Sequence, residues 1–71
     1  MTTAEIFAQR LKELRRENSL TQTQLAEKLK YKNYTIITHW ESGKIVPDIE
    51  NLKSLAKFFN VSIDYLVGIE K

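Results

Sequence analysis

The chain has 71 residues, of which 42% are hydrophobic and 28% charged, with a formal net charge of +2, one histidine and no cysteine. This length fits one small domain with a single core, and we expect residues 1–71 to form it. The missing cysteines exclude disulfides and thiolate metal sites, and one histidine is too few for the usual zinc sites. No segment approaches the roughly 20 consecutive apolar residues of a membrane-spanning helix. We therefore expect a cytoplasmic protein with no metal, no cofactor and no membrane association.

The first predicted helix runs from Ala4 to Glu17. Thr2 can cap it through its hydroxyl while the Glu5 carboxylate bonds back to the amide of the cap. Apolar residues at spacings of four and three share one side of this helix and predict a face turned toward the core: Phe7, Leu11 and Leu14.

Two short helices joined by a turn are predicted between residues 21 and 43. Thr21 can cap the first of them, with Gln24 completing the capping box. Asn33 can cap the second through its carboxamide, and Gly43 supplies a left-handed end. The expected core residues of the two helices are Leu25, Ala26, Leu29, Ile37 and Trp40.

The outward face of the second of these helices, at about residues 34–42, carries side chains that are short or planar hydrogen-bonding groups: Tyr34, Thr35, Thr38 and His39. Reading base edges in a major groove requires such groups, whereas an ordinary solvated face usually holds Glu and Lys. Residues 28–44 also carry four lysines against one glutamate, which favours contacts with phosphates. The segment indicates binding of double-stranded DNA; a solvated surface is the alternative for each of these side chains.

Two further helices are predicted after a loop at residues 44–47, where the proline disfavours helical angles in the residue before it. The fourth helix follows its cap Asp48, ends at Asn60 in a left-handed conformation, and has the core face Ile49, Leu52, Leu55, Ala56 and Phe59. The fifth lies between Ser62 and Gly68. No segment alternates apolar and polar residues for long enough to form a sheet, so we expect an all-α fold, a compact bundle of five short helices.

The chain resembles the helix-turn-helix domain of the Cro and phage-repressor type, also called the XRE family. The resemblance rests on RLKELRRENSLTQTQLAEKL at 10–29, WESGK at 40–44, Pro47 and LKSLAKFFNVSIDYLVG at 52–68. It implies a lambda-repressor-like fold and sequence-specific binding of double-stranded DNA by a homodimer, usually in transcriptional repression.

The resemblance also implies roles for single residues. The base-reading positions of the family fall on Tyr34, Thr35 and His39, with Thr38 less often used. Positions that contact the DNA backbone fall on Gln22, Ser42 and Lys44, and we add Lys32 in the turn as a candidate phosphate contact. Arg15 and Glu41 match a pair that forms a largely buried salt bridge between the first and third helices.

The chain departs from the commonest family pattern in the turn between the second and third helices. It has one residue more between Leu29 and Trp40, and Lys30 stands where glycine is usual. We expect a longer turn at Lys30–Lys32; the alternative is an earlier start of the third helix. The register of Tyr34 and Thr35 depends on which of these holds.

Two other function classes compete with DNA binding. An antitoxin-like module would neutralise a small partner protein and bind DNA secondarily; the sequence offers no extra segment for wrapping a toxin, which counts against it. Catalysis is not expected, because the chain has no paired carboxylates, nucleophile–base pair or phosphate-cradling glycine loop. A homodimer would use the globular domain itself around the fifth helix, with Phe58 and Tyr65 as candidate seam residues and the core as the alternative for both.

Overall fold

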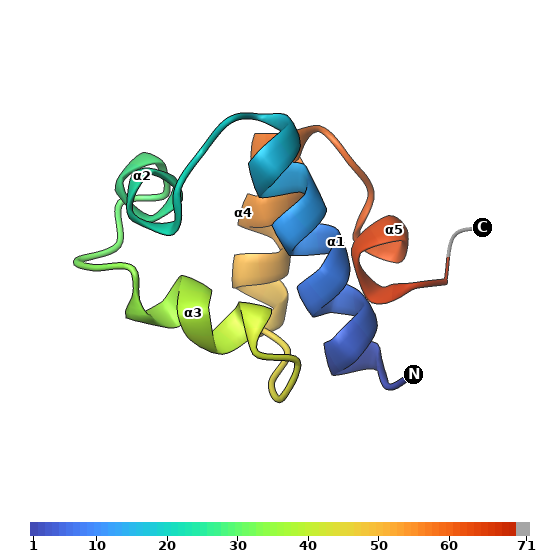
Figure 1. Cartoon of the computed structure of the whole chain (residues 1–71). Coiled ribbons are helices and arrows are strands. Elements are labelled where there is room, and N and C mark those ends of the chain that lie inside the picture. Colours follow the sequence, from blue (N-terminus) through green and yellow to red (C-terminus); the bar gives the residue numbers. More distant parts are fainter. Residues whose placement is uncertain (70–71) are drawn as a thin grey trace.

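A computed structural model describes residues 1–69, which form five helices: α1 (Thr3–Glu17), α2 (Gln22–Lys28), α3 (Thr35–Glu41), α4 (Ile49–Phe59) and α5 (Ile63–Val67). These residues contain no strand, so the all-α prediction is confirmed. Figure 1 shows α1 in the middle of the molecule, with α2 and α3 on one side and α5 on the other. Among the described helices, none is long and apolar enough to cross a membrane.

The core takes side chains from every one of these helices. Its largest fully buried members are Trp40, Phe7, Leu11, Leu25, Ile37, Leu55 and Leu66. The Trp40 ring meets Phe7 of α1 edge-to-face at 6.3 Å and Tyr31 of the turn at 5.8 Å between ring centroids. Such contacts add to the burial itself, so Trp40 fastens α3 to both α1 and the turn.

One predicted core residue was wrong. Ile49 keeps the helical spacing of the α4 face, yet it is 58% exposed. It stands in the first position of α4, at the edge of the core, and the buried Pro47 in the preceding loop lies inside instead. Helical periodicity identifies a face and does not show where along the helix the core ends.

Side-chain caps begin four of the helices, three of them as predicted. The Thr2 and Thr21 hydroxyls accept from the amides of Glu5 and Gln24, whose side chains bond back to the cap amides, although α1 starts at Thr3 rather than Ala4. Asp48 and Ser62 cap α4 and α5, while Asn60 and Gly68 end them in left-handed conformations.

The cap predicted at Asn33 was wrong by one residue. The N-cap of α3 is Tyr34, whose carbonyl accepts the first helical bond, from the Thr38 amide at 3.1 Å. Asn33 acts one residue earlier, and its carboxamide oxygen accepts from the Thr35 amide at 2.9 Å. The extra residue therefore lies in the turn, and Thr35 is the first residue of the helix.

Lys30 takes the left-handed conformation usually left to glycine, with a φ of 66°. The amides of Lys30 and Tyr31 return to the carbonyls of Glu27 and Ala26 at 3.1 and 2.9 Å and close α2. The Tyr31 hydroxyl then donates to the Asn51 side chain of α4. Burial, with a smaller contribution from the charge of Asp48, raises the pKa of Tyr31, so this hydroxyl keeps its proton at neutral pH.

Replacing Lys30 with glycine tests this conformation. Left-handed angles cost a residue with a Cβ about 1–2 kcal/mol, partly offset by the greater freedom of glycine in the unfolded chain. We expect Lys30→Gly to stabilise the protein by about 1 kcal/mol, which raises the melting temperature of a domain this size by about 4–8 °C. Lys32→Gly is the matched control, because Lys32 has no positive φ. A lower melting temperature in both variants would contradict the account.

Candidate nucleic-acid interface

A bidentate ion pair joins α1 to the end of α3. Arg15 Nε donates to Glu41 Oε2 at 2.7 Å, and Nη2 donates to Glu41 Oε1 at 3.0 Å. The two side chains are only 12% and 4% exposed, and the hydrogen bond to Glu41 raises the pKa of Arg15 above its ordinary value. Arg15 Nη1 also donates to the Leu20 carbonyl at 2.9 Å, so one guanidinium holds α1, α3 and the approach to α2.

Gln22 extends this ion pair to the first turn of α2. Its Nε2 donates to Glu41 Oε1 at 3.1 Å, and its Oε1 accepts from the Thr38 hydroxyl at 2.8 Å. We call these four residues, Arg15, Glu41, Gln22 and Thr38, the polar network. The two bonds made by Gln22 were missed by sequence reasoning, because they join residues 16 and 19 positions apart and depend on how α2 and α3 pack. A polar residue at the start of α2 was the one signal for them.

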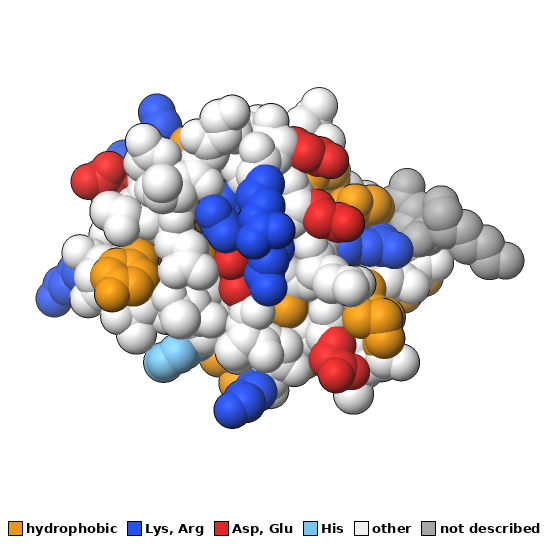
Figure 2. Space-filling view, in the orientation of Figure 1, with side chains coloured by type: hydrophobic (Ala, Val, Ile, Leu, Met, Phe, Trp, Pro, Cys, Tyr) orange, Lys and Arg blue, Asp and Glu red, His pale blue; other side chains and the backbone are white. Residues whose placement is uncertain are grey.

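The predicted base-reading residues share one exposed side of α3. Thr35, Thr38 and His39 are exposed, and Tyr34 at the cap is 50% exposed. Ile37 and Trp40 point the other way into the core. Figure 2 shows the one histidine of the chain, in pale blue, at the molecular surface. The structure thus brings the four polar side chains together on a helix whose inner side is fixed.

The predicted phosphate contacts lie around this face and differ in exposure and in the hydrogen bonds that they already make. Lys32 precedes α3 and Lys44 follows it, and both are exposed. Gln22 is half-buried in the polar network. The Ser42 hydroxyl donates to the His39 carbonyl and accepts from the Lys44 amide at 3.3 Å, so it serves the turn that Gly43 completes with a φ of 81°.

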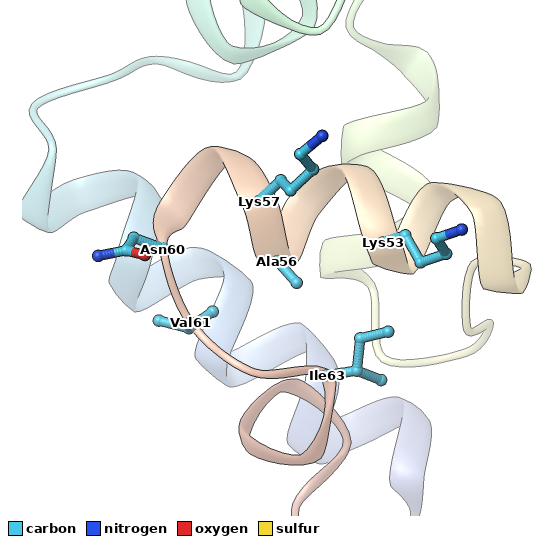
Figure 3. A pocket seen from close by; sticks show the side chains of 6 residues that line it. All are labelled: Lys53, Ala56, Lys57, Asn60, Val61 and Ile63. Atoms are coloured by element: carbon cyan, nitrogen blue, oxygen red, sulfur yellow. The ribbon is translucent and has the colours of Figure 1, made fainter.

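A shallow groove of about 320 Å³ separates α4 from the start of α5 (Figure 3) and is lined by Lys53, Ala56, Lys57, Asn60, Val61 and Ile63. On another face of α4, Phe58 is 39% exposed and its ring packs edge-to-face against Phe59. Tyr65 is engaged internally, since its ring lies under the Arg10 guanidinium at 4.4 Å and its carbonyl accepts from the same side chain. Within residues 1–69, no cluster of acidic or histidine side chains could hold a metal ion.

Comparison with known proteins connects this geometry to a family. Residues 11–66 match the helix-turn-helix family. The chain is 49% identical to the HTH-type transcriptional activator BcrR of Enterococcus faecalis over 65 residues, which cover 92% of the chain and 31% of BcrR. It is 40% identical to the HTH-type transcriptional regulator ImmR of Bacillus subtilis (strain 168) over 62 residues, which cover 87% of the chain and 48% of ImmR. The chain thus spans about a third to a half of the length of these relatives.

Removing the Glu41 carboxylate tests the energetic role of the ion pair. Glu41→Ala leaves the Arg15 guanidinium buried without its partner, which costs about 3–5 kcal/mol, a large share of the stability of a small domain. Urea unfolding followed by circular dichroism measures the loss. Glu50→Ala is the control, because Glu50 and Lys53 are 3.9 Å apart with side chains 78% and 60% exposed, and such pairs contribute at most about 1 kcal/mol. Equal midpoints for the two variants would show that the buried pair adds nothing.

Proposed function

Because the chain belongs to the helix-turn-helix family of the Cro and phage-repressor type, we propose that it is a sequence-specific, double-stranded-DNA-binding regulator of transcription. The observation that carries the proposal is the outward side of α3, which is exposed and polar while its inner side is anchored by Trp40 and Glu41. A recognition helix needs both properties, because base-edge bonds discriminate only when the side chains approach in a fixed register.

In the proposed complex α3 enters the major groove and α2 lies across the DNA backbone. Thr35 and His39 stand one helical turn apart on the exposed side, with Tyr34 at the cap. A threonine hydroxyl and an imidazole both bond base edges, and the tyrosine adds a planar ring with a hydroxyl. These three residues, together with Thr38, are proposed to read the sequence.

Phosphate contacts are proposed at the two ends of this surface. Lys32 and Lys44 carry their charges before and after α3, and the second Nε2 hydrogen of Gln22 is directed away from the bond to Glu41. Ser42 is proposed to shape the turn that presents Lys44, since its hydroxyl already makes two bonds there. These contacts position the protein without reading sequence.

We propose that the active form is a homodimer, because one helix reads only a few base pairs and two heads about 34 Å apart add their specificities. The side formed by α4 and α5 supports this role, since it offers the groove and, at the start of α4, the exposed Ile49. Phe58 is exposed on a different face of α4. Tyr65 is a weaker seam candidate because Arg10 covers its ring. The family resemblance favours repression, whereas BcrR is named an activator, so the proposal covers regulation in either direction.

Selection from a random pool of duplex DNA tests the proposal. The wild-type protein at moderate salt is expected to enrich a two-fold-related motif with half-sites about one helical turn apart. Thr35→Ala and His39→Ala are then expected to lose about 1–3 kcal/mol of affinity for that motif while binding random duplex as before. Enrichment of no sequence would overturn the proposal in favour of a protein partner, and equal losses on both duplexes would remove the two residues from base reading.

Lys44→Ala tests the phosphate contacts separately. Each phosphate neutralised by a cation adds about 0.9 to the slope of log affinity against log salt concentration. Affinity for specific and random duplexes is expected to fall alike, with the slope reduced by about one unit. Lys12→Ala, in α1 and outside the residues proposed to contact DNA, is the control. A slope unchanged by Lys44→Ala would exclude this contact.

A further inference from the structure

The polar network fixes which way its hydrogen bonds run, starting from Glu41. An ionised carboxylate can only accept hydrogen bonds, and the bidentate bond from Arg15 at 2.7 and 3.0 Å holds Glu41 in this form. The third partner within bonding distance, the Gln22 carboxamide at 3.1 Å, must therefore donate. The Nε2 side of Gln22 faces Glu41.

The direction of the Gln22 amide then decides the direction at Thr38. With Nε2 turned to Glu41, the carbonyl Oε1 of Gln22 faces the Thr38 hydroxyl at 2.8 Å. The reversed amide would set two oxygens 3.1 Å apart with no proton between them. A carbonyl oxygen only accepts, so Thr38 donates its proton inward.

The other neighbour of this hydroxyl is too distant to compete for its proton. The Tyr34 carbonyl lies 3.4 Å from Thr38 Oγ1, and it is also an acceptor. A hydroxyl has one proton and two lone pairs. At 3.4 Å this contact is longer than the roughly 2.5–3.0 Å of an ordinary O–H···O bond, so the proton goes to Gln22 Oε1 at 2.8 Å. The exposed side of Thr38 then presents lone pairs alone.

We propose that the polar network makes Thr38 an obligate acceptor on the reading face, the exposed side of α3 formed by Tyr34, Thr35, Thr38 and His39. Thr38 then selects a base that presents an amino group in the major groove, adenine or cytosine. A free threonine hydroxyl accepts or donates and reads either kind of edge. In the major groove, adenine N6 and cytosine N4 are the donors, whereas guanine and thymine offer acceptors. The inference rests on the proposed function and names the base class that one residue recognises.

Gln22 is the positioning residue in this scheme. Glu41 orients the Gln22 carboxamide, and the carboxamide in turn orients the hydroxyl of Thr38 on the exposed side of α3. Its role in specificity is distinct from the phosphate contact proposed above, because it acts on base choice through Thr38.

The test uses the duplex selected by the wild-type protein and the isosteric variant Thr38→Val. Selection with Thr38→Val identifies the base pair whose enrichment depends on the hydroxyl. At that pair, 2-aminopurine replaces adenine, or 2-pyrimidinone replaces cytosine, which removes the amino group from the major groove. We expect the wild-type protein to bind the altered duplex about tenfold more weakly and Thr38→Val to bind both duplexes equally. Thr38→Ser, which keeps the hydroxyl, is expected to retain the discrimination.

Gln22→Met tests the positioning role of Gln22, because it removes the acceptor of the Thr38 hydroxyl while keeping a side chain of similar length. We expect discrimination between the normal and the altered duplex to shrink several-fold, with thermal unfolding showing that the variant is folded. Unchanged discrimination would overturn the role of Gln22.

Three results would overturn the assignment of Thr38. In the first, Thr38→Val enriches the same base as the wild-type protein at every position of the motif. In the second, the wild-type protein binds the normal and the altered duplex with equal affinity. In the third, its affinity depends on the keto group of the opposite base and not on the amino group. Each of them leaves DNA binding intact and so differs from failure of the proposed function, in which the wild-type protein enriches no sequence and both proposals fall.

Discussion

The buried bond between Arg15 and Glu41 is the constraint on which the arrangement of α1, α2 and α3 depends. Buried ion pairs often stabilise a protein no more than apolar residues of the same volume, because desolvation offsets their attraction. An apolar pair at these positions could hold α1 against α3 by packing alone. It could not accept a hydrogen bond from the Gln22 carboxamide or donate one to the Leu20 carbonyl. We infer that the charge pair matters here because its bonds have direction, and packing contacts have none.

A second anchor stands beside the first in the last turn of α3. Trp40 packs its ring between Phe7 and Tyr31, and Tyr31 is itself bonded to Asn51 of α4. Tyr31 belongs to the lengthened turn, so the residues that make this turn unusual also tie it to the core. The left-handed Lys30 allows the chain to leave α2 in the direction that brings Tyr31 inward. An inserted residue thus changes the turn and leaves the inner side of α3 in place.

Much of this fold could be predicted from the sequence, because caps and apolar stripes are local signals. Each side-chain cap accepts from the amide three residues further along the chain, so the signal lies within four consecutive residues; the caps are Thr2, Thr21, Asp48 and Ser62. The cap predicted at Asn33 was wrong by one residue, because Tyr34 already has helical angles although the helix begins only at Thr35. The exposed face of α3 followed from spacing alone. The bonds of Gln22 did not, because they require the packing angle of two helices, and the base class of Thr38 follows only from those bonds.

Stability and specificity are coupled unequally across the proposed reading face. Thr35 and His39 are exposed and stand outside the polar network, and surface positions of this kind usually change stability by less than about 0.5 kcal/mol. If they read DNA as proposed, they can therefore vary with the DNA sequence that is read. Thr38 is also exposed, but its hydroxyl proton is committed to Gln22 and through it to the buried carboxylate of Glu41. In the proposed complex its base preference is thus set by the same carboxylate that joins α1 to α3, and that preference cannot be reversed without disturbing the bonds that hold the helices together.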